Sequence, residues 1–322
     1  MPELPEVETV RRGLVRLIGG RPITGVTVLH GKSCQIEDAD VAEYVVGATV
    51  TGVRRYAKVL VIDLDTGYSL VVHLKMTGQM VFRDDADTDL DWAAGHPTDS
   101  FVAALPDRST RVIFDLGVRT GDVAVPSPAP IAHLFFNDQR IFGWVRLEPT
   151  EEVEAIPFLT GLGPEPLTAV GEPLAPGPAR AAERRFLEQV RRHPGVPIKA
   201  AILDQTVIAG VGNIYADEAL WSARVHPTTR VRDLNDARLR LIFKEAAQAM
   251  LRSLEAGGST MRNYFQADGT PGSYLEAFAN VFRREGQPCP RCGTAIEKLR
   301  VAGRGTHVCP HCQRVRRSRA TP

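Results

Sequence analysis

The stretch KVLVIDLDTGYSLVVHL, residues 58–74, decides the fold of the first half of the chain. Two apolar runs, residues 58–64 and 68–74, flank the short polar segment DTG. Runs rich in Val, Ile and Leu around a tight turn are typical of a β-hairpin. Similar runs follow at residues 110–116, 132–136 and 143–147. The sequence therefore predicts that residues 22–148 are β-rich, within an N-terminal domain of residues 1–150.

A helix is predicted ahead of these strands. Apolar side chains recur at steps of three and four residues, and Gly19 and Gly20 end the pattern. Pro5 suits the first turn, where Glu3 and Glu6 complement the helix dipole. The apolar positions are Val7, Val10, Leu14, Leu17 and Ile18.

The second half of the chain is predicted to be helical. Pro and Gly are so frequent in residues 161–179 that a continuous helix or strand is unexpected, and we place a hinge at residues 151–179. A helical domain follows at residues 180–280, with a long helix capped by Asn235 and stopped by Gly257. The polar, Gly-containing residues 259–273 predict a functional loop. The fold class is α+β.

The net charge of +1 hides a strong asymmetry. Residues 279–322 hold ten Lys or Arg against two Glu, which indicates a site for a polyanion. Residues 84–99 hold six Asp and no Lys or Arg. We expect that segment to be an exposed insertion that faces away from the polyanion.

Four of the five cysteines form CPRC and CPHC, with sixteen residues between the two motifs. This spacing is typical of a zinc site with four thiolate ligands, and we predict one structural zinc ion in a finger within residues 281–322. Disulfides or a redox pair are the alternatives. His307 and His311 could also ligate, although four thiolates complete a tetrahedron. The predicted ligands are Cys289, Cys292, Cys309 and Cys312; Cys34 is expected to be a small buried side chain.

Length and hydropathy indicate a globular protein. The chain has 322 residues, of which 43% are hydrophobic, and contains no apolar run long enough to span a membrane. The first residues form an acidic helix where a signal peptide would need a basic and then an apolar run. We expect a soluble, cytoplasmic, monomeric protein without a membrane partner.

Three segments combine features of a nucleic-acid site. In AGVGNIYADEAL, residues 209–220, glycines precede a helix start, where backbone N–H groups can bind phosphate. HLKMTGQM, residues 73–80, and NDQRIFGW, residues 137–144, are strand-end loops with an apolar residue at the tip. An apolar side chain beside an arginine suits insertion into a DNA stack, although such residues more often belong to a core.

Together these segments resemble the bacterial formamidopyrimidine-DNA glycosylase family, whose members remove 8-oxoguanine from DNA. The resemblance rests on PELPEVE, HLKMTG, DQRIFG, AGVGNIYADEAL, GGSTMRNYFQADGTPG and RGTHVCPHC, in that order along nearly the whole chain. It implies an N-terminal β-sandwich domain with an N-terminal helix, a helix-two-turn-helix domain and a C-terminal zinc finger. It also implies that double-stranded DNA containing oxidised purines lies between the two halves.

The resemblance gives a chemical reason for the proline behind Met1. Removal of Met1 would leave Pro2 with a secondary amine that attacks C1′ of the nucleotide and forms a cationic iminium. That cation accepts electrons while the strand is cleaved by β,δ-elimination. Glu3 then suits general acid and base chemistry at the sugar ring oxygen, and Glu6 is interpreted as a supporting or helix-start carboxylate.

Other roles follow from the family motifs. Lys58 corresponds to the lysine that contacts phosphate and serves in β-elimination, and Arg304 to the finger arginine that clamps phosphate and assists δ-elimination. His73 and Asn213 correspond to phosphate contacts. Met76, Arg140 and Phe142 correspond to the three residues that fill the gap left by the flipped nucleotide, with Arg140 facing the orphaned cytosine.

The chain departs from the family at three places. The basic residue usual before Ile198 falls near Gly195, so Arg192 or Lys199 is expected to contact DNA instead. A family histidine is replaced by Ser109, and DPRRFG has become DQRIFG. These departures concern phosphate binding.

Two alternatives remain. An enzyme of the endonuclease VIII type would share the fold but act on oxidised pyrimidines; its usual PEGPE differs from PELPEVE here. A DNA-binding protein without catalysis would need only the helical domain, the finger and the basic tail. Retention of Pro2, Glu3 and Lys58 together favours the enzyme.

Overall fold

A computed structural model describes residues 2–96, 99–119, 132–255 and 279–315. The described residues divide into two compact units, of which the first comprises those up to Thr160 and the second those from Gly161 onward. The boundary between Thr160 and Gly161 falls inside the segment that the sequence assigned to the hinge. Helix α4 begins at Pro176, so the last four residues of that segment are helical.

Two five-stranded sheets form the first unit, as the β-rich pattern predicted. One sheet has the order β1-β8-β9-β6-β7 and the other β2-β10-β5-β4-β3. All pairs are antiparallel except β2 with β10. The bounds are β1 Ile23–Val28, β2 Cys34–Gln35, β3 Val50–Tyr56, β4 Val59–Leu64, β5 Tyr68–His73, β6 Gly78–Asp84, β7 Trp92–Gly95, β8 Thr110–Leu116, β9 Ala132–Asp138 and β10 Trp144–Pro149.

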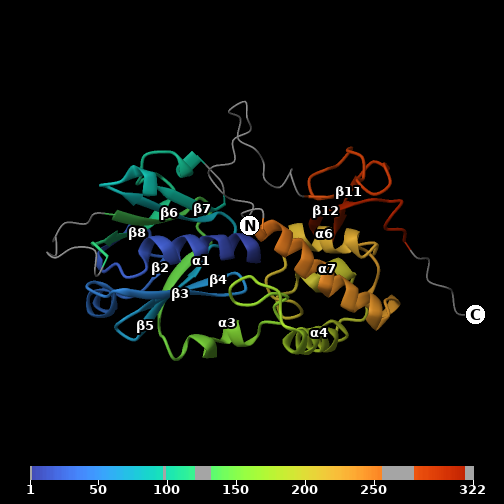
Figure 1. Cartoon of the computed structure of the whole chain (residues 1–322), viewed down its shortest axis with the longest axis horizontal. Helices are drawn as coiled ribbons and strands as arrows, with labels where there is room; N and C mark the ends of the chain where they lie inside the picture. The colour runs from blue at the N-terminus through green and yellow to red at the C-terminus, as the bar shows by residue number, and fades with distance from the viewer. Residues whose placement is uncertain (1, 97–98, 120–131, 256–278, 316–322) are drawn as a thin grey trace, which may run out of the picture. The chain divides into compact units, whose positions relative to one another are not determined.

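One apolar core joins both sheets to helix α1, Leu4–Ile18. All five predicted apolar positions of α1 are buried. In Figure 1 the helix runs between the labelled strands of the two sheets. The predicted hairpin is confirmed by the pairing of β4 with β5, in which Val59 lies opposite His73. Cys34 is buried in the same core, as expected.

The acidic segment is only partly the exposed insertion that the sequence predicted. Residues 85–90 are exposed, but residues 92–95 form the buried edge strand β7. The indole of Trp92 lies so close to Gly13 that a Cβ there would approach ring atom Cζ2 to 2.2 Å. Residues 92–95 therefore add a strand beside β6, because Trp92 packs against helix α1.

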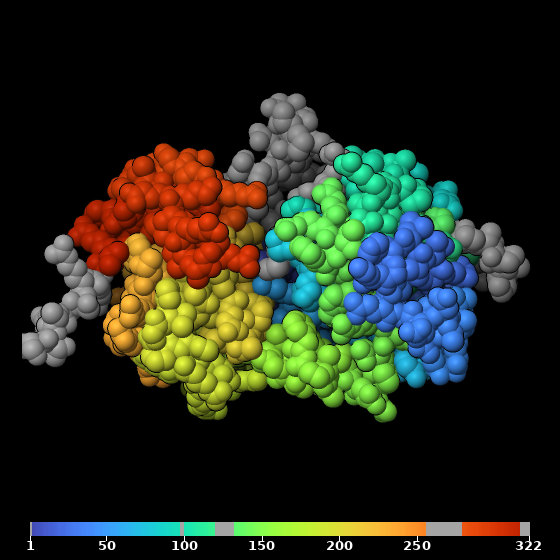
Figure 2. Space-filling model, turned by 180° about the vertical axis from the view of Figure 1, so that it is seen from behind, coloured from blue at the N-terminus to red at the C-terminus, as the bar shows by residue number. Residues whose placement is uncertain are grey.

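The second unit contains four α-helices, one short 3₁₀ helix (Val231–Asp233) and a β-hairpin within its described residues. Asn235 caps the long helix as predicted, because its side-chain oxygen accepts the Arg238 N–H at 2.9 Å. Trp221, in helix α6 (Asn213–Ser222), packs against Val281 and Cys289 of the C-terminal module, residues 279–315, which appears orange to red in Figure 2. The elements are α4 Pro176–Val190, α5 Ile198–Leu203, α6 Asn213–Ser222, α7 Asp236–Glu255, β11 Glu297–Val301 and β12 Arg304–Val308.

Candidate functional site

The first turn of α1 fixes the start of the chain. The Glu3 N–H donates to Glu6 Oε2 at 2.8 Å, so Glu6 caps the helix as the sequence predicted. Both carboxylates are 2% exposed, and Pro2 is buried as well. The capping hydrogen bond and the burial of both glutamates therefore fix the first turn of the helix directly behind Pro2.

A buried ion pair ties α1 to the β3–β4 turn. Glu8 Oε2 accepts from Arg55 Nε at 3.2 Å, and both side chains are fully buried. Burial alone would raise the pKa of Glu8, but Arg11, Arg55 and Arg12 lower it overall. The turn after Arg55 carries Lys58, which is 6% exposed. Sequence reasoning missed Glu8 and Arg55, because they look like surface charges on a helix and a strand.

His73 lies at the end of β5 as a neutral hydrogen-bond donor. Burial and, secondarily, the charges of Lys75 and Lys58 lower its pKa to about 3. Its Nδ1 accepts the Lys75 N–H at 3.0 Å, which leaves the proton on Nε2. The ring also lies 5.8 Å, centroid to centroid, from both Trp144 and Phe158. A neutral imidazole N–H can donate to a phosphate oxygen.

The two strand-end loops are joined to each other. The Thr77 hydroxyl donates to Asp138 Oδ1 and accepts the Arg140 N–H at 3.0 Å. Phe142 is 53% exposed, Arg140 is exposed and Met76 is half-buried. The Arg140 guanidinium carbon lies 4.9 Å from the centre of the Phe142 ring. Met76, Arg140 and Phe142, the three residues predicted to fill the gap left by a flipped nucleotide, therefore lie on two loops that are hydrogen-bonded to each other. We call them the wedge residues.

Lys199 is not available as a DNA contact, which corrects the sequence expectation. Its side chain is fully buried, and Nζ donates to Asp217 Oδ1 at 2.6 Å, Thr306 Oγ1 at 2.8 Å and the Gly305 carbonyl at 3.0 Å. A buried ammonium needs a paired carboxylate and satisfied donors, and all three protons are engaged here. Arg192 is exposed and stays the candidate for this contact.

Arg304 begins β12 at the tip of a hairpin. Ala302 and Gly303 form the turn with φ of 47° and 78°, and Val301 pairs with Arg304. Asn213 Nδ2, at the first turn of α6, donates to the carbonyl of Gly305 at 3.0 Å. The start of helix α6 therefore lies beside the hairpin tip that bears the exposed Arg304. A helix N-terminus and a guanidinium both bind phosphate.

Two further buried carboxylates of α6 hold the C-terminal module. Asp217 Oδ2 accepts the backbone N–H of His307 at 2.9 Å. The Glu218 carboxylate accepts the N–H groups of Asn280, Val281 and Phe282 at 2.9–3.0 Å. Sequence reasoning missed both residues, because DEA inside a helix is usually a solvated face. Their partners lie about 60 to 90 residues away and appear only in the fold.

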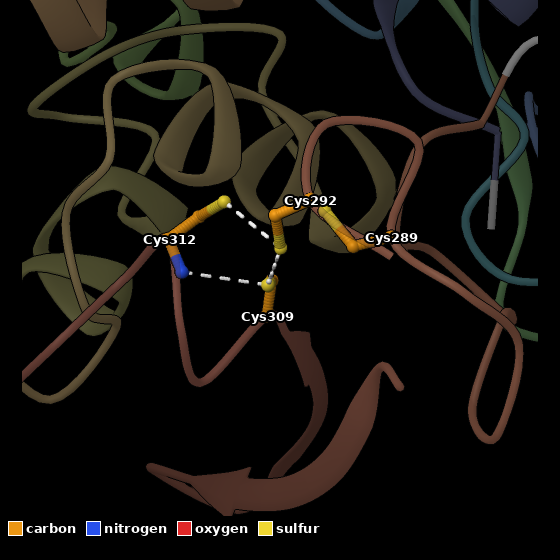
Figure 3. Close-up of side chains that lie close together, drawn as sticks. All are labelled: Cys289, Cys292, Cys309 and Cys312. Carbon is orange, nitrogen blue, oxygen red and sulfur yellow. Dashed lines mark hydrogen bonds between the residues drawn. The ribbon is translucent and has the colours of Figure 1, made fainter. Parts of the chain in front are cut away.

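The four predicted zinc ligands converge in this module. Their sulfur atoms all lie within 4.8 Å of one another, and Figure 3 shows the side chains of Cys292, Cys309 and Cys312 directed toward a common centre. Sγ of Cys292 is 3.5 Å from those of Cys309 and Cys312. Zinc–sulfur bonds of about 2.3 Å in a tetrahedron place sulfurs about 3.8 Å apart, so the arrangement fits zinc.

Two remaining predictions concern other parts of the chain. Ser109 is 3% exposed, and its hydroxyl donates to Asp107 Oδ1 at 2.6 Å. At the position of the family histidine, Ser109 therefore supports the loop before β8. The predicted loop at residues 259–273 and the end of the basic tail lie outside the described residues.

Comparison with known protein families gives three matches. Residues 1–145 match the formamidopyrimidine-DNA glycosylase N-terminal domain, residues 162–264 the H2TH domain of the same enzyme, and residues 286–315 a zinc finger found in FPG and IleRS. Among curated proteins, formamidopyrimidine-DNA glycosylase of Pelotomaculum thermopropionicum is 37% identical, over 98% of this chain and 100% of the relative. That of Chloroflexus aurantiacus is 37% identical over 97% and 98%.

Solved structures of similar proteins contain damaged DNA. A mutant of Lactococcus lactis FPG bound to Fapy-dG DNA matches with a TM-score of 0.75 and 28% identity, over 98% of this chain and 100% of that one. A MutM complex with carbocyclic 8-oxo-G DNA matches with the same TM-score and identity. Among the described helices of this chain, none combines the length and apolarity that crossing a bilayer requires.

Proposed function

Because this chain belongs to the formamidopyrimidine-DNA glycosylase family, we propose that it removes oxidised purines from duplex DNA and then cleaves the abasic strand. The DNA glycosylase activity follows from the family. The proposal concerns the substrates, 8-oxoguanine and formamidopyrimidines, and the lyase step. The observation that carries it is Pro2, directly behind Met1 and ahead of a helix start whose carboxylates are buried.

Pro2 is the proposed nucleophile. Once Met1 is removed, the lone pair of the proline nitrogen forms a bond to C1′, and the bond from C1′ to the base breaks. Terminal amines titrate at about 7.7 to 8.0, so an unprotonated fraction exists at neutral pH. The base leaves with the electrons of its bond to C1′ and takes up a proton, while the nitrogen loses its own proton. The C1′–O4′ bond of the sugar then opens as O4′ is protonated, and the nitrogen lone pair forms the C=N⁺ bond of an iminium ion, which stays cationic because its nitrogen carries no further proton to lose. Its positive charge stabilises the carbanion that forms when C2′ loses a proton.

Glu3 and Lys58 are the proposed proton-transfer and phosphate-binding groups. Glu3 would protonate the sugar ring oxygen as C1′ is attacked and later return the proton. Lys58 would bind the phosphate beside the lesion and serve in β-elimination of the 3′ phosphate. The Glu8–Arg55 pair supports this assignment, since it holds the helix that bears Glu3 against the turn that bears Lys58.

Extrusion of the damaged nucleotide is assigned to Met76, Arg140 and Phe142. The C1′ atom is inaccessible inside a duplex, so the nucleotide must leave the stack, at a cost of a few kcal/mol. The apolar and planar side chains at the tips of the two linked loops could occupy the gap. The Arg140 guanidinium offers donors to the carbonyl and ring nitrogen of the orphaned cytosine.

His73, Asn213 and Arg304 are the proposed further phosphate contacts, with Arg304 assisting δ-elimination. Each offers a donor that suits a phosphate oxygen: a neutral imidazole, a side-chain amide at a helix start and an exposed guanidinium. Zinc bound by the four cysteines would hold the hairpin that carries Arg304. We further propose that the protein acts as a cytoplasmic monomer.

Borohydride trapping on duplex DNA with 8-oxoguanine opposite cytosine tests the nucleophile. Wild-type protein should give a covalent complex through Pro2. A chain that retains Met1, or Pro2→Gly behind a tag, should give none, while Cys34→Ser should trap like the wild type. Undiminished trapping with a blocked terminus would place the nucleophile elsewhere.

A substrate panel separates the proposed specificity from the endonuclease VIII alternative. Single-turnover excision should be faster on 8-oxoguanine and formamidopyrimidine than on oxidised pyrimidines. The reverse order would assign the chain to the pyrimidine branch. Binding without excision of any lesion would make it a DNA-binding protein without catalysis.

A further inference from the structure

The carboxylate of Asp138, at the end of β9, accepts four hydrogen bonds from the two strand-end loops. Oδ2 accepts the N–H groups of Gly143 at 2.7 Å and Phe142 at 2.8 Å. Oδ1 accepts the Arg140 N–H at 3.2 Å and the Thr77 hydroxyl. Asp138 is fully buried and Thr77 is 8% exposed. One buried side chain thus binds the backbone around two wedge residues and the residue next to the third.

The loop held by Asp138 has an unfavourable backbone conformation. Ile141 has φ of 59°, and it stands between Arg140 and Phe142. A β-branched residue in the left-handed region is strained, and such a conformation persists only where its surroundings enforce it. The two N–H groups that follow Ile141 both donate to Asp138 Oδ2, so this carboxylate is well placed to enforce it.

The floor of the loop is closely packed. A Cβ on Gly143 would lie 2.7 Å from Phe136 Cζ and 3.1 Å from Asp138 Oδ2, so a side chain does not fit between the loop and the sheet. The side chains of Arg140 and Phe142 above this floor are exposed, and Arg140 lies over the Phe142 ring. The backbone is therefore fixed while the side chains remain accessible.

We propose that Asp138, together with Thr77, is a positioning residue that holds the Met76 loop and the Arg140–Phe142 loop in register for insertion into the DNA stack. The inference rests on the proposed function, in which these loops replace the extruded nucleotide. A rigid wedge is ordered before binding, so less conformational entropy is lost when it enters the duplex. Without Asp138 the two loops would have to become ordered during extrusion.

Asp138→Asn tests the proposal, because the amide replaces one acceptor oxygen by a donor that faces N–H groups. Single-turnover excision of 8-oxoguanine from duplex should fall roughly tenfold to a hundredfold. Strand cleavage at a preformed abasic site should change much less, because no base has to be extruded. Phe142→Ala, which removes one wedge directly, should show the same split.

Asp84→Asn is the control, and it additionally removes one partner of the buried Arg21–Asp84 ion pair, in which the N–O distance is 3.1 Å. Asp84 is also buried at a strand end, and its Oδ1 accepts two loop N–H groups, those of Ala86 and Asp87, at 3.0 and 3.2 Å. The loop that Asp84 binds carries no wedge residue. Asp84→Asn should therefore leave the ratio of 8-oxoguanine excision to abasic-site cleavage at the wild-type value. If Asp138→Asn lowered the 8-oxoguanine excision rate and the abasic cleavage rate equally, Asp138 would only stabilise the fold. The same conclusion would follow if Asp138→Asn and Asp84→Asn had the same ratio of these two rates.

Thr77 provides a second test if Asp138→Asn fails to fold. Thr77→Val removes the hydroxyl that bridges the loops and should lower excision selectively, whereas Thr77→Ser should restore it. A Thr77→Val rate ratio equal to wild type would contradict the bridge.

A fluorescence measurement distinguishes failure of this inference from failure of the proposed function. 2-Aminopurine opposite a stable abasic analogue reports insertion of the wedge without requiring catalysis. The wild-type chain should change its fluorescence on binding, and Asp138→Asn should change it less at saturating protein. A wild-type response without excision or trapping would overturn the proposed function alone; identical responses of wild type and Asp138→Asn would overturn the role of Asp138.

Discussion

At the scale of single residues, His73 should act as a neutral donor throughout the physiological range. Its pKa is about 3 in the folded protein against an ordinary 6.5, so below pH 6.5 the unfolded chain binds a proton that the folded chain does not. Its contribution to stability is complete above pH 6.5 and declines as the pH falls toward 3. The free energy of unfolding of wild type minus that of His73→Gln should follow this course. A difference independent of pH would contradict the burial argument.

Ile141 should be a site where a polar substitution stabilises the fold. A left-handed conformation costs an ordinary residue about 1–2 kcal/mol, and asparagine tolerates it better. Ile141 is 41% exposed, so little burial is lost. Ile141→Asn should raise the free energy of unfolding by up to about 1 kcal/mol in denaturant titration. Val102→Asn, at a 67% exposed position without positive φ, should stay within about 0.5 kcal/mol of wild type.

At the scale of elements, Lys199 should be needed to join α5, α6 and β12. Lys199→Met would leave the Asp217 charge buried without its main partner, which typically costs about 3–5 kcal/mol. Lys244→Met is the comparison at the pair of exposed Lys244 with half-buried Glu183, where the N–O distance is 3.5 Å, and should cost less than about 1 kcal/mol. Similar losses in the two variants, measured by unfolding of the second unit, would contradict this assignment.

The zinc site should stabilise the hairpin that carries Arg304. A module of this size has a small core, and its metal supplies much of its folding free energy. Cys309→Ser should lose zinc and DNA affinity together, whereas Cys34→Ser should retain one zinc ion per chain. Full DNA binding by metal-free protein, measured by metal analysis and titration, would show that the metal does not position Arg304.

At the scale of the whole molecule, DNA affinity should fall steeply with salt, because binding releases the counterions of phosphates. Arg304→Gln should lower the slope of log affinity against log salt by about one unit, and so should Arg192→Gln if that exposed arginine replaces the family contact. His73→Gln should leave the slope unchanged, since a neutral imidazole displaces no counterion. Arg16→Gln, at the opposite end of α1 from Pro2, is the control for a general loss of charge.

The sequence by itself determined the elements and the chemistry that depend on local pattern. Two apolar runs around a short polar turn predicted the hairpin at residues 58–74. Apolar residues at steps of three and four predicted helix α1, and cysteine spacing predicted the zinc ligands. These features depend on neighbours a few residues apart, which the sequence displays directly. The motifs also identified the family, and with it the candidate roles of Pro2 and Glu3.

Only the tertiary structure decided which charged side chains are buried and which segments their hydrogen bonds join. Lys199 looked like a DNA contact but lies in the interior with Asp217, because residues more than 100 positions away supply Gly305 and Thr306 as partners. In the sequence Asp138 is one polar residue of a predicted loop, but in the fold its carboxylate binds two loops together. Part of the predicted acidic insertion forms strand β7, because Trp92 packs against α1. Burial and hydrogen-bond partners are properties of distant segments brought into contact, so no local pattern could have revealed them.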